Sequence, residues 1–421
     1  MFTVEENQRI ASIRDVPISL FSSAGATQKQ ASDILDSVNK LYVMQLEALA
    51  FLVNADPSGL FHDINLKDIV QLLIMLARTP LEKPLQVPLY TWCEQAYLSY
   101  SDQDANRCIR HLFQLPLIVS SKLQALNSEF ATTVGLDEQY TVISGSQLIS
   151  SSRHIWVCFK HEPMSRTSAL IHGNTVIAEW NGMQWFSKSE LLDFKPRNYI
   201  SGYDIEFRNY AYSPIRIKEA WESSEHDTVT LELVKESIEE SIQILNKAWP
   251  SAESVLGTFV QLLLYSIPSL KGSHNSFSCP DHPFTQCIEI EIGNPLKNLE
   301  SIVHEAMHSK LYVLLRFQAL YRNPDHDLSF SHPWMNRPRP IRGVFMGMHT
   351  FSNILQLYAR VASCIPDLRH SAIRYFDSYD ADVSAAIDEA RRGDLTPEGD
   401  LFVSEVERLR LEARQMILSI A

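Results

Sequence analysis

The stretch Asn294-Pro295-Leu296-Lys297-Asn298-Leu299-Glu300-Ser301-Ile302-Val303-His304-Glu305-Ala306-Met307-His308 carries the clearest structural signal in the chain. Asn294 can cap a helix, and the proline after it suits the first helical turn. Apolar residues at helical spacing supply much of a buried stripe, namely Leu299, Val303, Leu311, Leu314 and Leu315. The sequence therefore predicts an ordered helix that carries His304 and His308.

The two histidines of this helix are spaced for metal binding. Residues four apart lie on one helical face, with their β-carbons about 5–6 Å apart, so both imidazoles can reach one cation. Neutral imidazole is a ligand for zinc and for ferrous iron. We therefore expect His304 and His308 to bind a metal. The alternative interpretation is a structural pair of histidines at accidental spacing.

Two histidines do not complete a metal site, so a third ligand is expected downstream. No glutamate occurs between Ala306 and Asp388, which removes the usual third ligand of thermolysin-type zinc peptidases. Leu311 and Leu314 occupy the positions where metzincins have a glycine and a third histidine. The remaining candidates are His326, His332, His349, His370, Asp325, Asp327 and Asp367.

His349 has the most suitable context among these candidates. It lies in Gly343–Phe351, which begins a predicted helix that continues through Val361. If this helix packs antiparallel against the first, His349 reaches the metal.

Three arginines precede His349 within six residues, at Arg337, Arg339 and Arg342. Arginine binds carboxylates through two parallel hydrogen bonds, so the cluster indicates a dicarboxylate co-substrate or an acidic peptide. A solvated basic loop on an acidic protein is the other interpretation.

Hydrophobic patterning predicts an α+β protein that is mainly α-helical. Apolar residues follow the helical period from about Thr27 to Glu129. Short aromatic and β-branched runs replace them from about Tyr140 to Ile217, with Asn181-Gly182 as a candidate hairpin turn. We expect an α-helical N-terminal region over residues 1–134 and a β-rich insert over residues 135–220.

The remaining residues, 221–421, form the predicted helical region that carries the two histidines. Helical periodicity runs through Val229–Leu245 and again through Val255–Leu264, and Cys287–Ile292 resembles a strand. A proline-rich loop at Asn323–Pro340 interrupts the helices that follow.

Composition limits the class of protein. Thirty-seven basic and fifty acidic side chains give a net charge of −13, which disfavours binding to nucleic acid. Met1–Glu6 lacks the basic flank of a secretion signal, and the longest mostly apolar run, Ile69–Ala77, is too short to cross a bilayer. We therefore expect a cytoplasmic protein with no membrane partner.

The six cysteines are scattered without a CxxC pair, at Cys93, Cys108, Cys158, Cys279, Cys287 and Cys364. This pattern favours reduced thiols over a zinc ribbon or a disulfide framework.

Together these residues resemble the HExxH-type 2-oxoglutarate- and Fe(II)-dependent peptide β-hydroxylases associated with ribosomally synthesised, post-translationally modified peptides. The resemblance covers roughly Leu231–Val361. It rests on the Gly272–Ser276 turn, the strand after it, Val303–Lys310 and Arg339–Val344 with the helix beyond. The HExxH motif alone is weakly specific. Together with the following His-Ser-Lys and RPxRGV segments, the match is much more specific.

The resemblance implies a precursor peptide as substrate, together with Fe(II), O2 and 2-oxoglutarate as a co-substrate that chelates the iron. His304, His308 and His349 would be the metal ligands, and Arg342 or Arg339 would bind the distal carboxylate of 2-oxoglutarate. The reaction would release succinate and CO2 and hydroxylate a side-chain β-carbon of the peptide.

The role of Glu305 distinguishes the competing functions. In the hydroxylase it would be a catalytic-site residue that binds the metal, supports a ligand or contacts the peptide. In a zinc metallopeptidase, the main alternative, it would be the general base that activates water. A third possibility is an inactive peptide-binding protein that keeps the helical scaffold.

Overall fold

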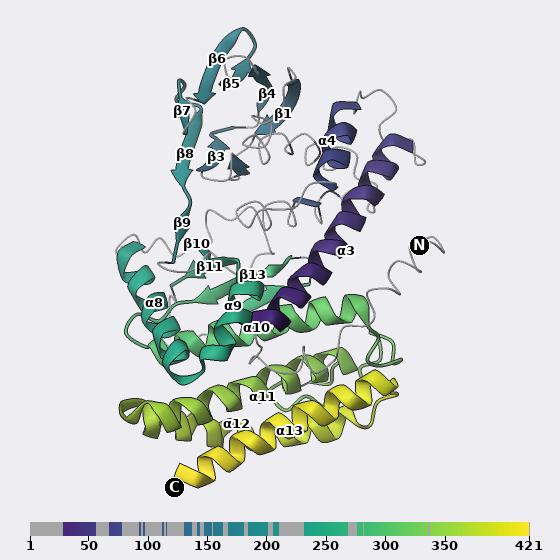
Figure 1. The fold of residues 1–421 in the computed structure, drawn as a ribbon, viewed down its shortest axis with the longest axis vertical. Coiled ribbons are helices and arrows are strands. Elements are labelled where there is room, and N and C mark those ends of the chain that lie inside the picture. Colours follow the sequence, from purple (N-terminus) through teal and green to yellow (C-terminus); the bar gives the residue numbers. More distant parts are fainter. Residues whose placement is uncertain are drawn as a thin grey trace. The chain divides into compact units, whose positions relative to one another are not determined.

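A computed structural model describes the chain in segments (Figure 1). They are residues 28–55, 67–77, 130–136, 141–143, 147–153, 155–162, 167–180, 184–200, 205–209, 231–267 and 276–420 without 281 and 336, together with Trp92, Cys93, Ala96, Leu112 and Leu115. Contacts divide the chain into two compact units. Unit 1 contains the described residues of Met1–Val38, Ile200–Ile205 and Ser224–Ala421, and unit 2 contains those of Asn39–Tyr199 and Glu206–Ser223.

Antiparallel strands dominate unit 2. A five-stranded sheet has the order β1 (Phe130–Leu136), β4 (Ile155–Glu162), β5 (Thr167–His172), β6 (Thr175–Trp180) and β7 (Trp185–Ser187). A three-stranded sheet consists of β2 (Thr141–Ile143), β3 (Gln147–Ser151) and β8 (Leu192–Pro196). The short strands β9 (Asn198–Tyr199) and β10 (Glu206–Asn209) pair antiparallel. Two helices, α3 (Gln28–Ala55) and α4 (Lys67–Ala77), precede the strands in sequence.

Local sequence explains the hairpins of the larger sheet. Gly173 adopts a φ of 60° between β5 and β6, a left-handed conformation that glycine accepts without strain. Strands β6 and β7 pair through Trp180 and Trp185. The Asn181-Gly182 turn predicted between them lies outside the described residues.

Unit 1 surrounds a short mixed sheet with helices. Strand β13 (His282–Glu289) pairs antiparallel with β12 (Phe277–Cys279) and parallel with β11 (Leu262–Ser266). The helical elements are α8 (Leu231–Ala248), η2 (Pro250–Ala252), α9 (Glu253–Phe259), α10 (Pro295–Phe317), α11 (Ile341–Cys364), η3 (Pro366–Leu368), α12 (Arg369–Ala390) and α13 (Pro397–Ile420).

The helix predicted over Val255–Leu264 is wrong in its second half. Helix α9 ends at Phe259, and Leu262–Leu264 belong to strand β11. These residues are buried against β13, and a short apolar run that is buried all round has no period that separates strand from helix. The strand predicted at Cys287–Ile292 is β13, which starts and ends earlier.

Helix α10 begins as its sequence predicts. The Asn294 side chain accepts a hydrogen bond from the Lys297 backbone N–H at 3.4 Å, and Pro295 occupies the first turn. The helix packs against β13 and α11, and α11 in turn packs against α12 and α13 (Figure 1). Helix α11 is buried around nearly its whole circumference, and polar side chains such as Ser352, Asn353 and Gln356 lie among its buried residues.

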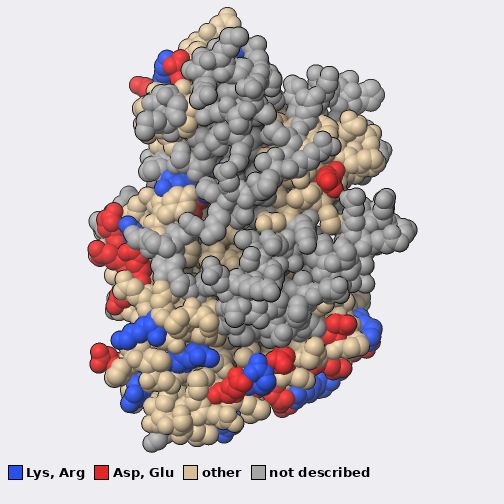
Figure 2. Space-filling model, viewed as in Figure 1, with Lys and Arg blue, Asp and Glu red and all other residues tan. Residues whose placement is uncertain are grey.

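The chain is therefore an α+β protein, mainly α-helical, with strands in its middle and helices at its C-terminus. The division at residues 134 and 220 stays a prediction. No helix in the described segments is both long and apolar enough to cross a membrane. Figure 2 shows basic and acidic side chains interspersed over the area that the C-terminal helices occupy in this view, where ion pairs such as Arg391–Glu407 and Arg408–Glu405 join them.

Candidate metal centre

His304 and His308 lie one helical turn apart on α10 and face each other edge to face. Their ring centroids are 4.6 Å apart and the rings are inclined at 88°. Nδ1 of His308 lies 3.1 Å from the Thr350 hydroxyl oxygen on α11. When Nδ1 carries the proton and donates it to Thr350, the lone pair on Nε2 is left for a cation.

Burial keeps both imidazoles neutral. Burial, followed by the positive charge of Lys297, lowers the pKa of His304 to about 4. Burial, followed by the charges of His304 and His332, holds the pKa of His308 well below its usual value. Neutral imidazole is the form that binds metals, so this pair is ready for a cation at neutral pH.

Aromatic side chains form a wall beside His304. The Phe351 ring of α11 lies 5.0 Å from the His304 ring, between Trp334 at 4.3 Å and Tyr379 of α12 at 4.9 Å. These rings exclude water from one side of the histidine pair, which strengthens electrostatic interactions there.

Helices α10 and α11 are antiparallel, which is the arrangement on which the expected position of His349 depended. Going along α10, Glu300, His304 and His308 contact residues that lie progressively earlier in α11. These partners are Tyr358, Phe351 and Thr350.

The structure does not bring His349 to the histidine pair. Each residue turns a helix by about 100°, so His349 points away from the face that carries Thr350 and Phe351. Its fully buried ring packs against Phe402 of α13, with centroids 5.4 Å apart.

His332 lies on the α10-facing side of α11, although it belongs to the loop before that helix. Its Nε2 is 3.4 Å from the position that a β-carbon would take at Gly347. The same added carbon would be only 2.6 Å from the Trp334 ring, so glycine is needed for this close approach. Nδ1 of His332 is buried and has no hydrogen-bond partner in the described segments.

The other downstream candidates lie at the surface. His326, His370, Asp325 and Asp367 are exposed, and Asp327 accepts a hydrogen bond from the Ser329 backbone N–H at 3.1 Å. Most of the Gly272–Ser276 turn lies outside the described residues.

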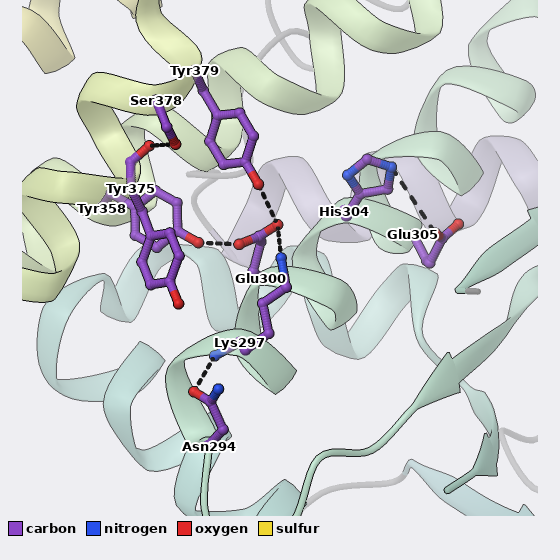
Figure 3. A network of polar contacts seen from close by, with 9 residues as sticks. All are labelled: Asn294, Lys297, Glu300, His304, Glu305, Tyr358, Tyr375, Ser378 and Tyr379. Carbon is purple, nitrogen blue, oxygen red and sulfur yellow. Dashed lines mark hydrogen bonds and ion pairs between the residues drawn. The ribbon is translucent and has the colours of Figure 1, made fainter. Parts of the chain in front are cut away.

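Glu305 is brought beside His304 and is almost completely buried. Its Oε1 is 4.0 Å from His304 Nε2 (Figure 3), and its Oε2 has no hydrogen-bond partner among the described residues. Burial raises the pKa of Glu305 to about 8, and the nearby Ser278 hydroxyl offsets part of that rise. In the metal-free protein this carboxyl group is therefore mostly protonated at neutral pH.

Glu300, one turn before His304, belongs to a hydrogen-bond network that sequence analysis missed. It accepts hydrogen bonds from the hydroxyl groups of Tyr358 and Tyr379, the latter at 3.1 Å, and pairs with Lys297 at 2.7 Å (Figure 3). The network fixes α10 against α11 and α12. A signal existed in the sequence, because Glu300 shares a helical face with His304 and a buried carboxylate needs partners.

The three arginines before α11 do not gather at one point. Arg337 is exposed, and Arg342 is exposed and paired with Asp325 at 3.0 Å. Arg339 is only partly exposed, and its Nε is buried without a hydrogen-bond partner in the described segments. The charge of Arg339 helps burial to lower the pKa of His332, and its Nη2 donates a hydrogen bond to Met335 Sδ at 2.6 Å.

The donor set fits a transition metal in part. Two neutral imidazoles suit Zn(II) or Fe(II), and the unpartnered atoms Glu305 Oε2 and His332 Nδ1 lie on residues beside them. Yet within the described segments no group of three or more His, Cys, Asp and Glu side chains is close enough to hold a metal. No family model and no curated protein matches the chain.

Proposed function

We propose that the chain is an Fe(II)- and 2-oxoglutarate-dependent hydroxylase that acts on a side-chain β-carbon of a ribosomally made precursor peptide. The observation that carries the proposal is the pair of neutral imidazoles, His304 and His308, held against α11. Its support also includes the sequence resemblance over Leu231–Val361.

The bound iron and co-substrate would supply the oxidative chemistry. One atom of O2 would enter the peptide as a hydroxyl group and the other would enter succinate. Loss of CO2 from 2-oxoglutarate and removal of hydrogen from the β-carbon each provide two of the four electrons that O2 requires.

The protein's own residues would bind and orient these groups. His304 and His308 would hold the metal, and Thr350 would fix the tautomer of His308. Phe351 and Trp334 would keep water from that side of the site. The sequence predicts His349 as the third ligand, but its ring packs against Phe402 and would have to reorient to reach a metal held by His304 and His308.

Arg339 is better suited than Arg342 to bind the distal carboxylate of 2-oxoglutarate. Arg342 already pairs with Asp325 in solvent, where an ion pair contributes little. Arg339 is more buried, and the charge-assisted fork that it offers to a carboxylate is stronger where water is excluded.

The first test is metal binding. Changing His304 or His308 to Ala should abolish Fe(II) binding with little loss of helix content, because α10 is held by its own buried stripe. Metal stoichiometry together with circular dichroism measures both effects. Full metal occupancy in either variant would exclude the pair as ligands.

The second test separates the hydroxylase from a zinc peptidase, in which Glu305 beside His304 would activate water. Anaerobic Fe(II) and 2-oxoglutarate should give the visible charge-transfer band of a chelated complex. Arg339→Ala should weaken 2-oxoglutarate binding by about 2–5 kcal/mol, with partial rescue by Lys, whereas Arg342→Ala should change it little. Absence of the band, together with tight zinc binding, would favour the peptidase.

A further inference from the structure

The position of a loop histidine extends the metal site beyond the pair on α10. Three residues of α11 share the face that is turned to α10, because Gly343, Gly347 and Thr350 follow one another at intervals of four and three. Thr350 contacts His308. Gly347 is about one turn and Gly343 about two turns from Thr350, so a residue that contacts both glycines lies on the same face of α11 as the His308 contact.

His332 occupies that position. A β-carbon added at Gly343 would lie 3.7 Å from Cδ2 of His332, and one added at Gly347 would lie 3.4 Å from its Nε2. The imidazole thus packs against the backbone of α11 at two glycines, which have no side chain to exclude it. Its ring also meets Trp334 edge-on, with centroids 5.6 Å apart and an inclination of 75°.

Contacts then continue from His332 to the proposed ligands. Trp334 stacks on Phe351 at an inclination of 18°, and Phe351 packs against His304. The His332 imidazole is also close enough for its charge to act on His308. The loop histidine and the pair on α10 therefore border the same space between α10 and α11.

The His332 ring has a hydrogen bond with the Gly343 backbone, but one of its nitrogens is left for a ligand. Nδ1 is buried and has no hydrogen-bond partner in the described part of the chain. A buried polar atom without a partner costs about 1–3 kcal/mol, so such atoms usually meet a ligand, an ion or water. A metal ion held by His304 and His308 would supply a partner for an imidazole nitrogen of His332.

We propose that His332 is the third protein ligand of the metal held by His304 and His308. The proposal rests on the metal site of the proposed function. It includes an inward shift of the His332 ring, because the metal-free arrangement has no ready group of three ligands in its described segments. The ring belongs to the loop between α10 and α11.

The experiment is Co(II) titration of the metal-free full-length protein, followed by absorbance of the bound ion. Loss of a residue behind the ligands usually weakens metal binding by 10- to 100-fold, so His332→Ala should weaken it by more than about 100-fold. The Co(II) spectrum of residual complex should also change, because its coordination changes. His332→Asp restores a ligand atom and should recover part of the affinity, which a purely structural role of His332 would not allow.

Two matched controls use other histidines of the chain. His326→Ala changes an exposed residue of the same loop and should leave Co(II) affinity unchanged. His349→Ala removes the competing candidate ligand, which packs on Phe402, and if His332 is the third ligand it should leave affinity within a few-fold. Circular dichroism of each metal-free variant identifies loss of folding, and His332→Asp provides a second substitution if the Ala variant does not fold.

The outcomes separate this inference from the proposed function. If the unaltered protein binds no metal, the proposed function fails and this inference fails with it. If the unaltered protein binds Co(II) and His332→Ala binds it equally well, only the inference fails. Loss of affinity in folded His349→Ala, with none in His332→Ala, would establish His349 as the ligand instead.

Discussion

Two carboxylates of α10, Glu300 and Glu305, are buried to a similar degree but have opposite surroundings. Glu300 receives two tyrosine hydroxyl groups and the Lys297 ammonium group. Glu305 has one oxygen 4.0 Å from His304 and another without a hydrogen-bond partner in the described segments (Figure 3). The two residues are five positions apart, so they point to different sides of the helix.

This contrast separates a structural group from a candidate functional one. A buried carboxylate whose acceptors are satisfied stabilises the packing of the elements that supply its donors. A buried carboxyl group with an unpartnered oxygen destabilises the protein unless something else binds there. The unpartnered oxygen of Glu305 therefore lowers the free energy of unfolding, whereas the network around Glu300 does not.

The largest expected effect is at Glu300. Glu300→Ala leaves the Tyr358 hydroxyl group buried without its acceptor, so we expect a loss of about 3–5 kcal/mol in the free energy of unfolding. Glu305→Gln is the matched control and should cost less than about 1 kcal/mol, because few partners are lost. Urea unfolding of the metal-free protein, followed by circular dichroism, measures both.

Equal losses in the two variants would contradict the comparison. It would also be wrong if Glu305→Gln were the more destabilising change, since Glu305 would then have a structural role as important as that of Glu300.

Replacing Tyr358 or Tyr379 should lower the free energy of unfolding by different amounts, because the two tyrosines differ in burial. Tyr358 is completely buried, and both burial and Glu300 hold its pKa well above the usual value. We expect Tyr358→Phe to cost about 1.5–3 kcal/mol, the range for a hydrogen bond to a charged group. Tyr379 is partly exposed, so water can replace its bond and Tyr379→Phe should cost about 1 kcal/mol or less.

A double-mutant cycle tests whether these effects belong to one network. Tyr358→Phe combined with Glu300→Gln should show a coupling energy of about 0.5–3 kcal/mol in urea unfolding. Additive losses would show that Tyr358 and Glu300 stabilise the protein independently.

The sequence predicts the scaffold of this site better than its details. The cap at Asn294 and the buried stripe of α10 both follow from local patterns of residue type. The helical phase of His349 relative to α10 does not, because it depends on which face of an apolar helix meets which neighbour. Helix α11 is buried on several sides and its buried positions include polar residues such as Ser352, Asn353 and Gln356, so residue type does not mark that choice.

The position of His332, in the loop before α11, could not be predicted from local patterns of residue type either. His332 reaches α11 because Gly343 and Gly347 leave room for it, and spacing along the chain does not reveal which loop residue fills such room. Strand β11 was missed for a similar reason, since its four buried residues Leu262–Tyr265 follow no period.

The smallest expected effect in the Glu300 network is at Lys297. Its side chain is 17% exposed and pairs with Glu300 three residues along the same helix, where the two tyrosines already satisfy the carboxylate. Partly solvated pairs of this kind contribute about 1 kcal/mol or less. Lys297→Met keeps the aliphatic part of the side chain and removes the charge, so the free energy of unfolding should fall by no more than that amount. The loss should shrink further in 1 M NaCl, because salt screens a pair that water can reach. A loss as large as that of Glu300→Ala would mean that the Lys297 ammonium group, and not the two tyrosines, offsets the cost of burying Glu300. Glu300 and Glu305 would then differ only in charge pairing.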